Sequence, residues 1–172
     1  MVDVQTVSVA VASAGVFVAA VYYMLQLRHQ GKMRQTEIET RQTDLLLRIY
    51  STFGSEEFQK ALNKTFFMEF KDYNDFVKRY SSPTGFADTP EGITMGTVNV
   101  LFEEIGVLLH RKLIDLELVD DLFGYAAVYV WERIKPAVEG WRKQFQIPRS
   151  LQQFEYLYNE LKKRERKGVN SG

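Results

Sequence analysis

Glu103 and His110 are the residues whose types and spacing best suit a chemical role. They lie seven positions apart in the apolar segment 93–113, so a helix would place them on one face together with Asn99 and Gly106. A carboxylate and an imidazole on one face could form a small polar or metal site. The alternative is a helix-contact face with ordinary hydrogen bonds, which is favoured because no second segment clearly offers further ligands.

The adjacent carboxylates Glu103 and Glu104 are a second candidate. Both interrupt an apolar run, and a buried carboxylate needs a partner because desolvation disfavours its charged form. Arg133, on the next predicted helix, is a suitable partner, as are Arg48 and Arg142. We therefore predict that Glu103, Glu104 and Arg133 are structural buried polar groups. A general acid–base role would also need a nucleophile or a substrate pocket, and the sequence reveals neither.

Most other site chemistries lack the residues that they need. The 172-residue chain has no cysteine, which removes disulfides, thiol nucleophiles and Cys-ligated metals. Neither of its two histidines, His29 and His110, follows a Glu at the spacing of a di-iron motif. Calcium-loop, P-loop, dinucleotide-binding and nucleophile-elbow patterns are also missing. With 22 basic and 22 acidic residues, the chain does not favour a nucleic-acid partner. We predict no catalytic residue, no cofactor and no metal.

The segment 6–27 organises the chain. Its 22 residues include no Lys, Arg, Asp or Glu, and as a helix they would span roughly 33 Å, enough for a bilayer core of ~30 Å. A cleaved signal peptide is disfavoured because Asp3 is the only charged side chain before the run. The basic residues Arg28, Lys32 and Arg34 follow the span and are expected at the membrane interface. The positive-inside rule then places the N-terminus outside and the remaining chain in the cytosol.

Small and polar residues form a stripe along this predicted transmembrane helix. A spacing of three and four residues is typical of a seam between helices, and small side chains allow close backbone approach in lipid. Packing against identical helices is the leading interpretation; a pore lining and simple composition are the alternatives. The stripe comprises Gln5, Ser8, Ala12, Gly15, Ala19, Tyr22 and Gln26.

The rest of the chain predicts an all-α architecture. We expect an anchor over 1–27, a polar helical stalk over 28–44, a cytosolic bundle of four to five helices over 45–161 and a charged flexible tail over 162–172. Apolar residues recur at helical spacing, and no alternating strand pattern is bounded by hairpin turns. Phe102 and Trp131 are predicted to be central packing residues.

Helix boundaries can be predicted from capping residues. Ser55, Asp115 and Ser150 are each expected to cap the helix that follows. A further helical turn is expected to begin within 72–75, and the Pro- and Gly-containing segment 81–92 is expected to be a loop. Pro136 should kink or restart its helix because the proline ring clashes with the preceding turn.

The segments FEEIGVLLHRKLIDLELVDDLFG and WERIKPAVEGWR resemble an uncharacterised prokaryotic family of small membrane proteins. The resemblance covers roughly residues 25–161. It implies one N-terminal transmembrane helix and a cytosolic helical domain of unknown function. It implies no activity and no site residues, because the shared motifs are structural.

Together these features predict a membrane-anchored helical interaction or scaffold protein that self-associates through its transmembrane helix. Its expected partners are the lipid bilayer, further copies of the chain and an unknown protein. The alternative is a homo-oligomeric channel in which the small and polar stripe lines the conduit. An enzyme acting at the membrane surface is the third hypothesis, and the missing catalytic motifs weigh against it.

Overall fold

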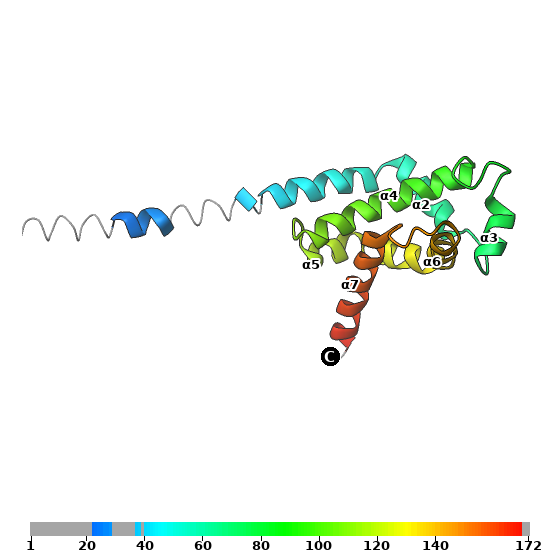
Figure 1. The fold of residues 1–172 in the computed structure, drawn as a ribbon. Helices are drawn as coiled ribbons and strands as arrows, with labels where there is room; N and C mark the ends of the chain where they lie inside the picture. Colours follow the sequence, from blue (N-terminus) through cyan, green and yellow to red (C-terminus); the bar gives the residue numbers. More distant parts are fainter. Residues whose placement is uncertain (1–21, 29–36, 39, 170–172) are drawn as a thin grey trace, which may run out of the picture. The chain divides into compact units, whose positions relative to one another are not determined.

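The computed structural model describes residues 22–28, 37–38 and 40–169. The chain divides into two compact units, Met1–Thr43 and Asp44–Gly172. All named elements in the described ranges are helices, which confirms the predicted all-α class (Figure 1). One isolated antiparallel bridge joins Ser82 to Gly85 within the loop before α4.

In the unit Met1–Thr43, residues 22–28 are helical, as are 37–38 and 40–43. Glu37 and Arg41 form an exposed ion pair of 2.6 Å one helical turn apart. The predicted anchor and stalk fall in this unit, and most of their residues lie outside the described ranges. The N-terminal transmembrane helix therefore stays a prediction.

The unit Asp44–Gly172 contains a helical bundle that follows the helical residues 44–53. α4 is its central element and packs against α2 and α7, while α3 packs against α6 (Figure 1). The named elements are α2 (Glu56–Phe66), α3 (Tyr73–Tyr80), α4 (Pro90–His110), α5 (Leu116–Val119), η1 (Asp120–Gly124), α6 (Tyr125–Phe145) and α7 (Gln152–Val169).

Four helices begin at a local side-chain cap. The caps are Ser55 of α2, Asp72 of α3, Thr89 of α4 and Asp115 of α5, and each accepts a hydrogen bond from a backbone N–H two or three residues later. Such a cap satisfies one of the amides that the first helical turn leaves unpaired. The caps at Ser55 and Asp115 confirm the predictions, and Thr89 followed by Pro90 starts α4 three residues earlier than predicted.

The core is built around α4 and the aromatic residues that meet it. Phe102 and Trp131 are buried, as predicted. Both contact Phe154 of α7, with ring centroids 4.9 Å and 5.0 Å apart respectively. Aromatic pairs at these separations add to the stabilisation from burial alone. The core therefore joins α4, α6 and α7 in a single cluster.

Two helix predictions need correction. α6 continues through Pro136 without restarting, and the segment before it contains a π-helical turn, η1, between α5 and α6. α7 extends to Val169 and so includes most of the segment expected to be a flexible tail. Ion pairs support this extension, among them Lys162–Glu165 at 2.6 Å and Arg164–Asp120 at 3.0 Å.

α4 is also the one helix in the described part of the chain that is long and apolar enough to cross a membrane. Half of its most apolar window is buried inside the domain. Val98, Phe102 and Ile105 are among its fully buried residues. A core helix passes the same test of length and hydropathy, and these contacts identify α4 as a core helix.

Candidate functional site

A pocket lies between the first half of α4 and the second half of α6. Its volume is about 280 Å³. Phe86 and Ala87, from the loop before α4, form one side, and Ser150 and Leu151, which lead into α7, form another. The pocket is thus assembled from segments that are distant in the sequence.

Small residues on α4 create this hollow. Gly92 lies against the loop: a Cβ there would be 1.9 Å from the carbonyl oxygen of Phe86, so only glycine fits without a backbone shift. Gly96, one turn later, faces open space, with no neighbouring atom within 4 Å of its would-be Cβ. The loop is drawn close to α4 at Gly92, and the pocket opens beside Gly96.

Asn99 is the polar residue of the pocket wall that most needs explanation. Its exposed fraction is 7 %, and its Oδ1 is buried without a hydrogen-bond partner in the described structure. Leaving a buried acceptor unpaired costs about 1–3 kcal/mol. The neighbouring wall includes Phe76, which has no donor, and Trp141, whose indole N–H is a donor but makes no hydrogen bond to this oxygen.

Glu103 positions the segment that closes the pocket. Its Oε2 accepts a hydrogen bond from the backbone N–H of Phe154 at 2.7 Å, and its Oε1 accepts one from the N–H of Gln153 at 3.2 Å. A carboxylate from α4 thereby caps the first turn of α7, where the helix dipole also favours negative charge. The expected local cap Ser150 does not take this role. Its carbonyl instead accepts a hydrogen bond from Arg142 Nε at 2.8 Å.

The same face of α4 continues to His110. Its Nδ1 lies 2.8 Å from Oε1 of Gln153, and its ring packs near that of Tyr156. Gly106 lies between Glu103 and His110 on this face and lets the backbones of α4 and α7 approach each other. A Cβ at Gly106 would be 2.0 Å from the Gln153 carbonyl oxygen. The Glu103–His110 face is therefore a helix contact with ordinary hydrogen bonds. Among the described residues, no group of acidic and histidine side chains is arranged to hold a metal.

The predictions for the other polar groups have mixed outcomes. Glu103 is half-buried, but its partners are backbone amides rather than an arginine. Glu104 is exposed, which corrects the prediction, because successive helix residues point about 100° apart and Glu103 already faces α7. Arg133 is half-buried and donates to the Tyr129 hydroxyl at 3.4 Å. Arg142 pairs with Glu155 at 2.7 Å.

Residues 9–161 match the family described as a domain of unknown function, DUF4760. The chain belongs to this family. The match includes the whole segment for which the sequence resembled an uncharacterised family, roughly 25–161, and it carries no assigned activity. No curated protein and no solved structure matches the chain.

For this DUF4760 member, the predicted seam and interface residues fall mainly outside the described ranges. Tyr22, Gln26 and Arg28 belong to the helical residues 22–28, and all three are exposed. The remaining predicted residues, Gln5, Ser8, Ala12, Gly15, Ala19, Lys32 and Arg34, lie outside the described residues.

The pocket was not predicted from the sequence. A partial signal was present, because Gly92, Gly96 and Asn99 recur at helical spacing in an otherwise apolar helix. Small residues with an amide on one helix face indicate a close contact or a hollow. They do not show which segment lies opposite, and here that information comes from α6 and the residues before α7.

Proposed function

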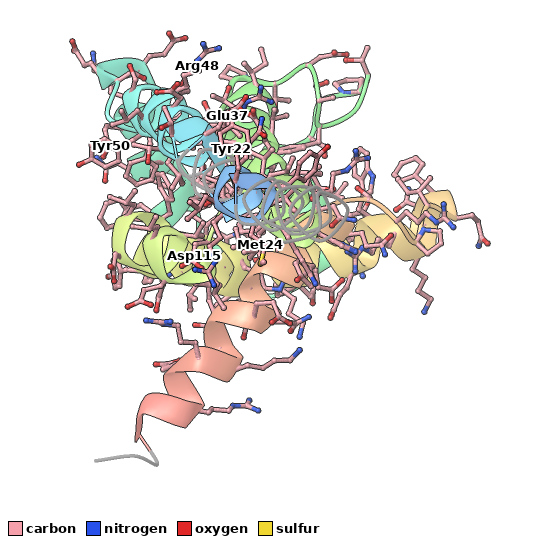
Figure 2. All side chains as sticks on the ribbon, turned by 90° about the vertical axis from the view of Figure 1, so that its left-hand side faces the viewer. Tyr22, Met24, Glu37, Arg48, Tyr50 and Asp115 are labelled. Carbon is pink, nitrogen blue, oxygen red and sulfur yellow. The ribbon has the colours of Figure 1, made fainter. Side chains whose placement is uncertain are left out.

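We propose that this protein is a membrane-anchored helical module whose anchor, residues 6–27, self-associates and holds the domain at the cytosolic membrane surface. One observation carries the proposal. The helical residues 22–28, at the end of the uncharged run, leave every large apolar side chain exposed, by 57–67 %. Figure 2 labels two of these side chains, Tyr22 and Met24. These side chains are Tyr22, Tyr23, Met24, Leu25 and Leu27. A helix with large apolar side chains around its surface needs lipid or other helices to cover it.

The residue types at this end of the run also suit a membrane interface. Tyr22 and Tyr23 are amphipathic rings of the kind enriched where hydrocarbon meets headgroups. Arg28 follows at the end of the described helix, and the predicted interface residues Lys32 and Arg34 come next in the sequence. This order of apolar run, aromatic pair and basic cluster supports a cytosolic C-terminal side.

Self-association is supported by the stripe of small and polar residues. Without a hydrophobic force between helices in lipid, association depends on close backbone packing and polar contacts. Ala12, Gly15 and Ala19 would permit that packing, and Gln5 and Gln26 could hydrogen-bond between copies near the two interfaces. The domain adds exposed aromatic side chains, Phe67 and Tyr125, each 79 % exposed, that a protein partner could cover.

The test is the assembly state of the full-length chain, extracted from membranes and measured by native mass spectrometry and crosslinking. Gly15→Leu is expected to lower the number of copies because its side chain would push neighbouring backbones apart. Val18→Leu, on the bulky side of the same predicted helix, is the matched control and is expected to change nothing. Recovery of the wild-type chain in the soluble fraction after alkaline extraction would contradict the anchor.

Two other outcomes would change the proposal. Equal behaviour of Gly15→Leu and Val18→Leu would show that the stripe does not mediate association. An intact assembly of five or more copies, with ion flux into liposomes altered by Gly15→Leu, would favour the channel alternative, since a dimer or trimer leaves no room for an aqueous pore.

A further inference from the structure

The end of α6 and the turn after it expose apolar side chains within a basic segment. Phe145 is 51 % exposed and Ile147 is 40 % exposed, and Pro148 beside them is exposed as well. The sequence from 140 to 151 contains no Asp or Glu. Residues 143–149, called here the basic turn, therefore combine a small apolar surface with positive charge.

The shape of the basic turn is fixed by hydrogen bonds. Gln146 ends α6 in the left-handed conformation, with φ of 57°, and the Ile147 N–H donates to the Arg142 carbonyl at 3.1 Å. The Arg142 side chain also donates to the Ser150 carbonyl at 2.8 Å and to Glu155 Oε2 at 2.7 Å. The turn is thus preorganised, which lowers the entropy that its apolar side chains would lose on meeting a partner.

The two ends of the basic turn carry cations that the domain does not use. Lys143 and Arg149 are both exposed, and neither forms an ion pair with any residue that the structure describes. The nearest acids along the sequence, Glu139 and Glu155, are each paired with another cation. The positive charge of the turn is therefore left for a negatively charged partner.

The other strongly exposed aromatic side chains have different surroundings. Phe67 and Tyr125 are each 79 % exposed. Phe67 borders a hollow together with Glu91, and Glu69 follows it in the sequence. The exposed Asp121 precedes Tyr125 by four residues. A negatively charged surface would repel these acids, so the basic turn suits such a surface better than either of these two sites.

We propose that the basic turn is a second membrane contact. Phe145 and Ile147 enter the headgroup region of an anionic leaflet, and Lys143 and Arg149 bind the lipid phosphates and carboxylates. The inference rests on the proposed function, because the anchor brings the domain to the cytosolic leaflet, which carries the anionic lipids. An anchored chain keeps that leaflet at high effective concentration, so a contact of this small size is sufficient.

The experiment places a fluorophore beside the turn and asks whether lipid quenches it. Because the chain has no cysteine, Gln144→Cys gives a unique labelling site next to Phe145. The labelled full-length chain is placed in phosphatidylcholine nanodiscs, with or without phosphatidylserine, that contain spin-labelled lipid as the quencher. We expect quenching in the phosphatidylserine discs and much less in the neutral discs or at high salt, which screens the attraction. Asn63→Cys, on α2 one turn before Phe67, is the matched control label and should not be quenched.

Substitutions in the turn test which side chains make the contact. Lys143→Glu and Arg149→Glu should each lower the ratio of lipid-bound to free turn by about 5-fold or more, the contribution of one cation near an anionic leaflet. Phe145→Ala should lower it by about 10-fold, because a large apolar side chain no longer leaves water. Phe67→Ala, which removes an exposed ring elsewhere on the domain, is the matched control and should change nothing. All four side chains are exposed, so the variants should fold.

Two separate readouts distinguish failure of the anchor from failure of the turn. A chain that elutes apart from the nanodiscs would contradict the anchor and this inference together. A chain that co-elutes with an unquenched label at Gln144→Cys would overturn the lipid contact alone and leave Phe145 and Ile147 to a protein partner. Quenching that needs no phosphatidylserine, that Lys143→Glu leaves unchanged, or that the Asn63→Cys label shows equally would also overturn the proposed contact.

Discussion

The N-terminus of α7 differs from those of α2, α3, α4 and α5. Those four helices are each capped by the residue immediately before them, Ser55, Asp72, Thr89 or Asp115. α7 is capped by Glu103, which lies on another helix and about fifty residues earlier in the chain. The first kind of cap stabilises one helix; the second also ties two helices together.

The two kinds of cap use the same hydrogen bonds but form at different stages of folding. A local cap forms as soon as its helix does, because donor and acceptor are at most three residues apart. The Glu103 cap forms only when α4 and α7 are docked, so its hydrogen bonds report the tertiary contact. Its loss should release α7 from α4 and open the pocket that the preceding residues help to close.

The largest effect is expected for Gly106→Ala, which separates α4 from α7. The added Cβ would meet backbone atoms of Gln153, so one helix must move. Overpacking of this kind costs up to about 3 kcal/mol. The free energy of unfolding, measured with urea on the full-length chain, should fall by that amount, with faster amide exchange at the start of α7.

Gly96→Ala is the matched control for this substitution. It lies on the same helix and adds its methyl group to open space, so stability should stay the same or rise by up to about 1 kcal/mol, because alanine is the better helix former. Equal stability of the two variants would contradict the close contact at Gly106.

Glu103→Ala should have the next largest effect. It removes two charge-assisted hydrogen bonds at a half-buried helix end, and we expect a loss of about 2 kcal/mol in the free energy of unfolding. Glu104→Ala, at the neighbouring exposed position, should stay within about 0.5 kcal/mol of wild type.

Removal of a local cap gives a reference value against which the effect of Glu103→Ala can be compared. Asp115→Ala should cost about 1 kcal/mol, as is usual for an N-cap, and should leave amide exchange in α7 unchanged. If Glu103→Ala costs no more than Asp115→Ala and does not loosen α7, then the remote cap is no different from a local one.

The smallest effect concerns pH and the start of α3. The Arg79 side chain, together with the Lys71 backbone N–H, lowers the pKa of Asp75. Because the folded-state pKa lies below the unfolded value, this stabilisation is present above about pH 4 and is lost as the pH falls through the lower, folded value. The protection of the Lys71 amide, which is its exchange rate relative to the unfolded rate at the same pH, should therefore fall in acid, and Asp75→Asn should remove that pH dependence. An unchanged profile in Asp75→Asn would assign it to another group.

Much of the fold was predictable, since its signals are local. Apolar residues at helical spacing predict the helices, and the caps at Ser55 and Asp115 begin α2 and α5 as expected. Pro136 was predicted to kink or restart its helix, and the restart is wrong because α6 continues through that residue. The predicted cap at Ser150 is wrong. Serine is a good capping residue by type, but the backbone N–H groups of Gln153 and Phe154 donate to Glu103 instead.

The sequence by itself determined the helical class, the local caps, the missing thiol chemistry and the long uncharged N-terminal run. Each of these depends on residue type or on neighbours within one or two turns. Only the tertiary structure decided that Glu103 faces α7 while Glu104 faces water, and that Gly96 and Asn99 border a pocket. Those outcomes depend on which segment packs opposite α4, and helical periodicity defines a face without naming its partner.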